Sequence, residues 1–174
     1  MLKKVVIALD GSKNSERAFG FACDLGAKFK SEIHLVHVVT EREVPDDIKR
    51  MAEIERLIPS QLKTEEEESG TSRRFGSVLK TVDKGGDTYR ILEKLGENLL
   101  ASSKEDAEGK GVGSVTTALL RGDPATELIK YLKSNGVDAV ISGSRGLGKL
   151  RGLLVGSVSS KLAQYAPCSS IVVK

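Results

Sequence analysis

The order of apolar and polar positions along the chain predicts strands that alternate with helices. Residues 3–9, KKVVIAL, end in an unbroken apolar run, which is typical of a strand buried on both faces of a parallel sheet. A helical pattern follows, which Asn14 or Ser15 can cap, and residues 32–39, EIHLVHVV, predict a second strand. This strand, helix and strand form one right-handed crossover unit. The apolar positions that recur at helical spacing are Ala18, Phe19, Ala22, Leu25, Ala27 and Phe29.

The pattern weakens between residues 40 and 86. Residues 46–58, DDIKRMAEIERLI, predict a short amphipathic helix, but the remainder has mixed charge, few aliphatic residues and several turn formers. We interpret 40–86 as a mobile or variable insertion in a single domain that spans residues 1–174. Helical periodicity returns at residues 87–111, where leucines and one isoleucine mark one face of a second long helix.

The last third of the chain has the most regular pattern. Residues 112–120 predict a third strand, and a helix follows in which Asp123 is the cap, Pro124 takes the first position and Gly136 is the stop signal. The remaining predicted elements are a strand at 137–142, a short helix that begins near Gly156 and Ser157, and a final strand at 169–174.

Five strands that alternate with four main helices predict an α/β fold, in which helices cover both faces of a five-stranded parallel sheet. The common doubly wound order for such a sheet is 3-2-1-4-5, the flavodoxin-like layering. In this order the first and fourth strands are neighbours, and the loops that leave them part to form a crevice where ligands bind. Its predicted walls are residues 9–15, LDGSKNS, and residues 143–157, GSRGLGKLRGLLVGS.

Composition narrows the class of protein. A chain of 174 residues with 39% hydrophobic residues builds one full-sized core. Its net charge of +3 is mild and both signs are spread along the chain, which argues against a nucleic-acid partner. The apolar run near the N-terminus is too short for a signal sequence or a membrane span, so we expect a cytoplasmic protein without membrane contact.

The residue types that most often bind metals are poorly placed for it. Cys23 and Cys168 lie far apart without a C-x-x-C pair, so we expect free thiols, with Cys23 in the core. His34 and His37 have an odd spacing within one strand, so their side chains point to opposite faces of the sheet. Packing or surface roles are therefore expected for both histidines.

The loop after the fourth predicted strand invites comparison with a P-loop. Its first eight residues, GSRGLGKL, match G-x-x-x-x-G-K-[ST] except at Leu150, which has no oxygen for magnesium. A P-loop must also lead directly into a helix, whereas this chain continues through RGLLV before the helix that starts at Gly156 and Ser157. We therefore reject the P-loop interpretation.

A different division of the loop fits anion binding better. Gly143 and Gly146 have no Cβ, so a polyphosphate can lie against their backbone, and after nine further residues Gly156 and Ser157 begin a helix whose N–H groups attract anions. Ser157 and Ser159 add hydroxyl donors at that end. The positive charges around the mouth of the loop are Arg145, Lys149 and Arg151.

This spacing, G-2x-G-9x-G-[ST], resembles the nucleotide-binding signature of the universal stress protein family. The opening VVIALDGSKNSERAF, the strand IHLVHVV, residues 120–146 and the ending YAPCSSIVV are similar to segments of the same family, whereas residues 40–86 match none of its patterns. The resemblance implies an adenine nucleotide α-hydrolase-like sheet. For the ATP-binding branch of the family, it implies ATP with Mg²⁺ or Mn²⁺ at the loop.

Carried over position by position, the resemblance implies a nucleotide site along the ends of the strands. Asp10 would lie near the ribose or the metal ion, Val38 would contact adenine, and Gly122 would close one edge. Ala8 and Leu9 would join Asp10 on the adenosine side. The residues implied to hold the phosphates are Gly143, Ser144, Gly146, Gly156, Ser157 and Val158.

The end of the chain departs from the family's common ending, APCPVLVV. Ser169 and Ser170 precede Ile171 here, which alters the edge of the last strand. In family dimers that strand often pairs with its twin. The resemblance therefore implies a homodimer formed through Ile171, Val172 and Val173.

We expect an ATP-binding stress-response protein in which nucleotide occupancy changes a dimer surface or the surface for an unidentified protein partner. Catalysed hydrolysis needs a positioned base. The chain offers Asp10 and Asp123 but no His, Glu or Gln inside the glycine loop, so ATPase activity is expected to be at most weak or partner-dependent. Two alternatives stay open: an ATP-hydrolysing or nucleotidyl-transfer enzyme on the same fold, and a nucleotide-free dimeric interaction module.

Overall fold

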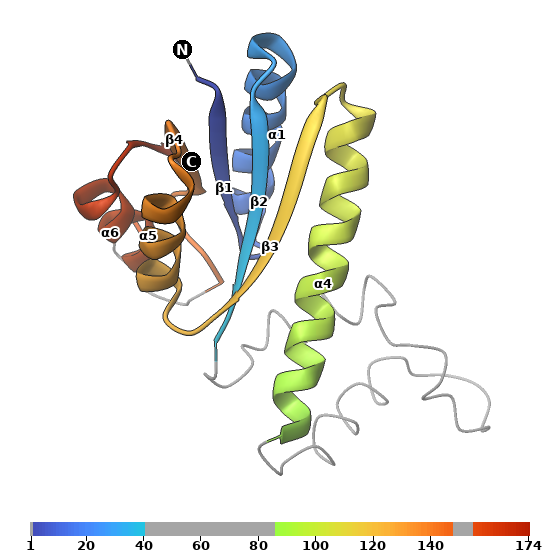
Figure 1. Cartoon of the computed structure of the whole chain (residues 1–174). Coiled ribbons are helices and arrows are strands. Elements are labelled where there is room, and N and C mark those ends of the chain that lie inside the picture. The colour runs from blue at the N-terminus through green and yellow to red at the C-terminus, as the bar shows by residue number, and fades with distance from the viewer. Residues whose placement is uncertain (1, 41–85, 148–154) are drawn as a thin grey trace, which may run out of the picture.

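A computed structural model describes residues 2–40, 86–147 and 155–174, and these parts show the predicted alternation of strands and helices (Figure 1). The strands are β1 (Lys4–Leu9), β2 (Glu32–Val39), β3 (Ser114–Arg121), β4 (Ala139–Gly143) and β5 (Ser169–Val173). The helices of the described ranges are α1 (Lys13–Phe29), α4 (Gly86–Gly109), α5 (Pro124–Asn135) and α6 (Ser157–Tyr165).

The five strands form one parallel sheet in the order β3-β2-β1-β4-β5, which confirms the predicted topology. The central strand β1 pairs with β2 on one side, where Leu9 is opposite His37, and with β4 on the other, where Ala8 is opposite Ser142. The carboxyl ends of β1, β2 and β4 therefore meet at one edge of the sheet, which we call the carboxyl edge.

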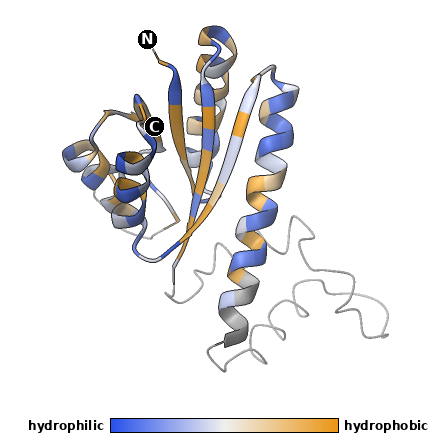
Figure 2. Ribbon diagram, in the orientation of Figure 1, coloured by the Kyte–Doolittle hydropathy of each residue, from blue (hydrophilic) through white to orange (hydrophobic). Residues whose placement is uncertain are grey.

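Helices cover both faces of the sheet, as predicted. α1 and α4 pack on one face, where Ile7 and Leu35 are fully buried, and α5 and α6 pack on the other, over Val6 and Val36. Figure 2 shows the central strands largely in orange, whereas the edge strand β3 is paler. Adjacent residues of one strand thus enter different cores, which explains why the central strands are apolar at nearly every position.

The caps of two helices follow from short polar side chains and glycines. In α1 the N-cap is Ser12 and not Asn14 or Ser15 as expected, because the turn at Gly11 (φ 76°) brings the Ser12 hydroxyl within 3.2 Å of the Ser15 N–H. In α5 the predictions are confirmed: the N-cap is Asp123, Pro124 is the first helical residue, and Gly136 ends the helix at φ 58°.

The buried stripe of α1 is narrower than the apolar pattern indicated. Ala18, Phe19, Ala22 and Cys23 are buried, and the stripe ends at Gly26, which packs against Ile33. Of the predicted apolar face, Ala27 and Phe29 are exposed, since Ala27 lies about 100° around the helix from Gly26. Both cysteines are free thiols.

Two further sequence predictions concern the start of the third strand and the segment between residues 40 and 86. The third strand begins at Ser114 rather than at residue 112, because Val112 still donates its N–H to the Ala107 carbonyl and closes the end of α4. The predicted helix at 46–58 and nearly all of the proposed insertion lie outside the described residues. Within the described ranges, no helix combines the length and the apolar character needed to cross a membrane.

Candidate functional site

The loops after β1 and β4 leave the carboxyl edge toward opposite faces of the sheet. β1 leads into α1 on one face, whereas β4 leads toward α6 on the other, and the two strands are hydrogen-bonded neighbours. This is the topological switch point at which doubly wound sheets bind ligands. The loops also contact each other: the Ser12 hydroxyl donates to the Arg145 carbonyl at 3.2 Å, and the Asn14 side-chain amide lies 3.4 Å from the Ser144 hydroxyl.

Asp10 is held in a tight turn at the centre of this region. Its Oδ1 accepts the Ser12 N–H at 3.0 Å, and its own N–H donates to the Ser15 hydroxyl at 3.2 Å. Its second carboxylate oxygen, Oδ2, faces Gly146, where a Cβ atom would overlap it. The turn therefore uses one oxygen of Asp10 and directs the other toward the glycine loop.

Gly143 and Gly146 allow the two loops to approach each other closely. A Cβ on Gly143 would lie 2.7 Å from the Asn14 carbonyl carbon and 2.8 Å from the Ser15 nitrogen, in the first turn of α1. We expected the missing side chains to make room for a polyphosphate. The structure shows that the space beside both glycines is occupied by the β1–α1 loop and the first turn of α1, so their first role is to seat the loop against Asp10 and α1.

The far end of the glycine loop closes on its beginning. The Gly156 N–H donates to the Ser144 carbonyl at 2.7 Å, and the Ser144 N–H donates to the Val173 carbonyl at 2.6 Å. The buried Ser159 hydroxyl lies 3.3 Å from the Ser144 carbonyl and 3.1 Å from the Gly156 carbonyl. The Gly156 N–H and the Ser159 hydroxyl, which we expected to face an anion, therefore hold the loop together in this structure.

The first turn of α6 supplies the remaining donors of the loop. The helix begins at Ser157 after the N-cap Gly156, which has no side chain to cap it, and its first turn contains no acidic residue. The N–H groups of Ser157 and Val158 belong to the opening positions that have no carbonyl partner within a helix. Together with the exposed Ser157 hydroxyl, they offer an anion the positive end of the helix dipole.

The residues expected around adenosine divide between the two faces of the sheet. Ala8 and Val38 pack on the α5 and α6 side, whereas the Leu9 side chain is buried in the core on the opposite side. The Leu9 carbonyl accepts a hydrogen bond from His37 Nδ1 at 2.8 Å, so the carbonyl is already engaged. Gly122 directly follows β3 at the same edge, where its N–H donates to the Val39 carbonyl at the end of β2 at 3.0 Å.

Apart from those at the start of α6, the expected nucleotide-binding residues therefore lie along the carboxyl ends of four adjacent strands, from β3 to β4. Three strand spacings span roughly 14 Å, a distance that suits an extended nucleotide better than a single phosphate.

In the part of the site that the structure describes, the charged side chains of the two loops include Asp10 and Arg145. Arg145 is exposed at the start of the glycine loop, while Lys149 and Arg151 lie outside the described residues. Among the residues that the structure describes, no three His, Cys, Asp or Glu side chains gather into a metal site. A single carboxylate, that of Asp10, is enough for a Mg²⁺ ion whose other ligands are phosphate oxygens and water, which is how this cation binds with nucleotides.

Sequence reasoning missed three residues that build the site. Ser12 joins the two loops, Ser15 holds the Asp10 N–H, and His37 holds the Leu9 carbonyl. The spacing of Asp10, Ser12 and Ser15 around Gly11 directly after a strand was the available signal, since short polar side chains at such a turn bind nearby backbone. For His37 the signal was its position opposite Leu9 at the ends of two paired strands.

Comparison with known proteins adds relatives over the full chain. The universal stress protein YxiE of Bacillus subtilis (strain 168) is 28% identical over 174 residues, with all of both chains covered. A solved structure of universal stress protein UspA from Lactobacillus plantarum has a TM-score of 0.66 at 14% identity, covering 99% of this chain and 98% of that one.

Two further solved structures were determined with nucleotides. A universal stress protein in complex with cAMP has a TM-score of 0.62 at 18% identity, with 99% of this chain and 97% of that chain covered. A family protein from Arabidopsis thaliana with AMP bound has a TM-score of 0.57 at 18% identity, covering 99% and 91%. At these identities the likeness shows the fold. The model of the universal stress protein family matches residues 1–174, and the chain therefore belongs to that family.

Proposed function

We propose that this protein binds ATP with Mg²⁺ at the carboxyl edge and responds to nucleotide occupancy as a stress-response switch. The observation that carries the proposal is the placement of two groups beside the glycine loop. Asp10 directs one carboxylate oxygen toward Gly146, and the acid-free first turn of α6 follows the end of the same loop. The cAMP and AMP complexes of family members with this fold support an adenine nucleotide as the ligand.

In this proposal each part of the nucleotide has its own residues. Adenine lies against Val38 and Ala8 on the α5 and α6 side, and Gly122 closes that end. The phosphates meet the N–H groups of Ser157 and Val158, with Arg145 at the mouth. Asp10 would face a Mg²⁺ ion bound with the nucleotide from the β1 end, and the ion would neutralise phosphate charge.

The site favours binding over catalysis. Hydrolysis requires a base that orients water at the terminal phosphate. Within the described part of the glycine loop and the first turn of α6, no side chain can act as that base, and Asp123 caps α5 and lies 3.8 Å from Lys161. We therefore propose that hydrolysis is slow or depends on another protein.

The switch that we propose runs from the loop to the edge strand β5. Because the Ser144 N–H donates to the Val173 carbonyl, the start of the glycine loop is tied to the strand that would form a homodimer through Ile171, Val172 and Val173. A nucleotide shifts such an equilibrium only by its different affinity for the two states. Light scattering with and without Mg·ATP measures the mass of the protein in solution, and an unchanged mass would refute the coupling.

The proposal places the protein in the cytoplasm, where ATP is available.

The decisive experiment is a direct search for nucleotide. The purified protein is denatured and its supernatant separated by chromatography, and the stripped protein is titrated calorimetrically with ATP, AMP and cAMP, each with and without Mg²⁺. We expect ATP to bind most tightly and to require Mg²⁺. Absence of bound nucleotide together with no measurable affinity would refute the proposal, and tighter binding of AMP or cAMP would correct its ligand.

The enzymatic alternative has its own outcome. Multiple-turnover phosphate release that disappears in Asp10→Asn would show an ATPase.

A further inference from the structure

His37 lies at the end of β2 and reaches across to the end of β1. Its Nδ1 is 2.8 Å from the Leu9 carbonyl oxygen, and a carbonyl only accepts hydrogen bonds. The proton must therefore be on Nδ1, which fixes the tautomer of a neutral ring. Burial lowers the pKa of His37, which favours the neutral ring.

The peptide bond that His37 holds is the one that carries Asp10. Its carbonyl, from Leu9, accepts from His37, and its N–H, from Asp10, donates to the Ser15 hydroxyl. Two side chains from different elements thus fix both polar atoms of a single peptide plane. Because this plane leads directly into Asp10, its orientation sets the position of the Asp10 Cα, from which the carboxylate reaches the Ser12 N–H with one oxygen and faces Gly146 with the other.

The His37 ring is itself fixed from outside by α4. A Cβ atom on Gly96 would lie 2.7 Å from His37 Cδ2 and 2.7 Å from Leu119 Cδ1, so α4 can pack this closely on β2 and β3 only through a glycine. The ring therefore has a strand on one side and the α4 backbone on the other. Contacts of this kind leave it little freedom to turn away from Leu9.

We propose that His37 is a positioning residue of the nucleotide site, which holds the Leu9–Asp10 peptide so that the Asp10 carboxylate faces Gly146, with Gly96 of α4 locking its ring. The inference rests on the proposed nucleotide binding. It adds α4, through Gly96, to the elements that support the site. His37 does not touch the ligand in this proposal. It acts through the backbone of β1.

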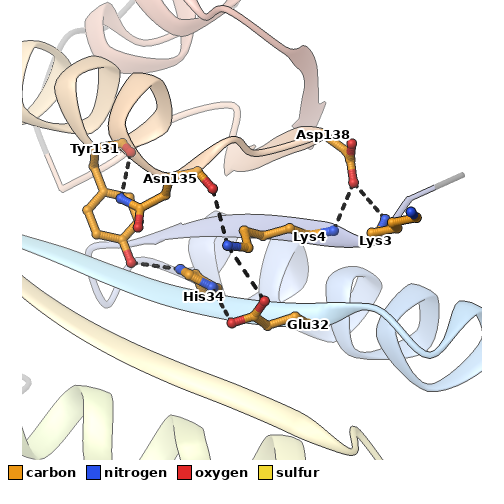
Figure 3. Close-up of polar contacts among 7 residues, drawn as sticks. All are labelled: Lys3, Lys4, Glu32, His34, Tyr131, Asn135 and Asp138. Atoms are coloured by element: carbon orange, nitrogen blue, oxygen red, sulfur yellow. Dashed lines mark hydrogen bonds and ion pairs between the residues drawn. The ribbon is translucent and has the colours of Figure 1, made fainter.

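His34 provides a matched control on the same strand. It is buried, whereas His37 is partly buried, and it faces α5, where Nδ1 is 2.7 Å from the Tyr131 hydroxyl and Nε2 is 2.8 Å from a Glu32 oxygen (Figure 3). Replacing His34 removes a histidine with two side-chain partners and leaves the Leu9–Asp10 peptide in place. Loss of stability alone would therefore affect both positions, whereas loss of positioning would affect only His37.

The experiment compares His37→Leu, His37→Asn and His34→Leu. Asparagine can present an N–H where His37 has Nδ1–H, and leucine cannot. We expect His37→Leu to weaken Mg·ATP binding about tenfold, as loss of one partly buried hydrogen bond allows, and His37→Asn to restore most of the affinity. His34→Leu should lower the melting temperature and leave the affinity unchanged. Equal affinity in all three variants would overturn the inference while leaving the proposed function intact.

A second readout needs no nucleotide. NMR of the ¹⁵N-labelled protein shows which ring nitrogen of His37 carries the proton and where the Asp10 amide resonates. We expect the Nδ1–H form, and an Asp10 amide shift that His37→Leu moves and His37→Asn restores. An Nε2–H ring, or an Asp10 amide that no variant moves, would overturn the inference. If the expected NMR pattern appears but the wild type binds no nucleotide, the proposed function fails and the hold of His37 on Asp10 stands.

Discussion

At the scale of single residues, one hydroxyl group joins the two halves of the site. The buried Ser12 side chain accepts the Ser15 N–H as the N-cap of α1 and donates to the Arg145 carbonyl in the glycine loop. The sequence indicated a cap two or three residues later, because the contribution of Gly11 to the turn is not visible in helical periodicity. The contact with Arg145 joins residues 133 positions apart and follows only from the sheet topology.

Ser12→Ala is expected to separate these two roles. Loss of the cap lowers the free energy of unfolding by about 1 kcal/mol. Loss of the bond to Arg145 removes one contact between the two loops and loosens the glycine loop, so the affinity for Mg·ATP falls roughly threefold or more. Urea unfolding and calorimetry measure the two effects. Ser12→Thr, which keeps the hydroxyl, serves as the control, and an Ala variant with unchanged affinity would contradict the role of the loop contact.

At the scale of elements, the start of α6 combines closure of the loop with the proposed anion site. The pattern of glycines correctly predicted where α6 begins, because a glycine before an amphipathic segment is a local signal. It did not predict that the Gly156 N–H would donate to the Ser144 carbonyl, since that hydrogen bond depends on how the loop folds back. The N–H groups of α6 that remain for a phosphate are therefore those of Ser157 and Val158.

Gly156→Asp tests the proposed phosphate position. The backbone of Gly156 (φ −73°, ψ 165°) suits any residue, and a Cβ there would lie no closer than 3.4 Å to its neighbours. Aspartate is a good N-cap, so stability should hold or rise by a few tenths of a kcal/mol. Its charge would occupy the place of a phosphate and weaken ATP binding more than about 100-fold.

Gly156→Asn is the matched neutral variant, since it caps equally well without the charge. It should lose far less affinity than the aspartate variant in the same titration. If both variants bind ATP as the wild type does, the phosphates lie elsewhere and the assignment of Ser157 and Val158 is wrong.

At the scale of the whole molecule, the strand order was predictable because alternating strands and helices leave few topologies. The polar contacts at the opposite edge of the sheet, where the strands begin, could not be predicted. There, Asp138 accepts the backbone N–H groups of Lys3 and Lys4, and Glu32 links His34 to Lys4 (Figure 3). These residues come from distant parts of the chain, and their side chains are of kinds that most often face solvent. No local pattern distinguishes such a network from an ordinary polar surface.

This network predicts how the fold responds to acid. Hydrogen bonds from the backbone of Lys4 and Lys3 lower the pKa of Asp138 below its ordinary 3.8, and the hydrogen bond from His34 lowers the pKa of Glu32 below 4.5. A carboxylate whose pKa is lower in the folded state stabilises the fold above its unfolded pKa, and this stabilisation is lost as the pH falls through the folded value. Stability should therefore decline below about pH 4.5.

Asp138→Asn tests this sign while keeping an oxygen that can accept both N–H groups. We expect the variant to be less stable than the wild type at pH 7 and to approach it at pH 3, because only the wild type has a carboxylate at position 138 to protonate in between. Urea unfolding at intervals from pH 7 to pH 3 measures the difference. Asp106→Asn, on the exposed surface of α4, should leave the pH profile unchanged. An Asp138→Asn protein whose stability runs parallel to that of the wild type over this range would show that the Lys3 and Lys4 contacts do not stabilise the ionised carboxylate.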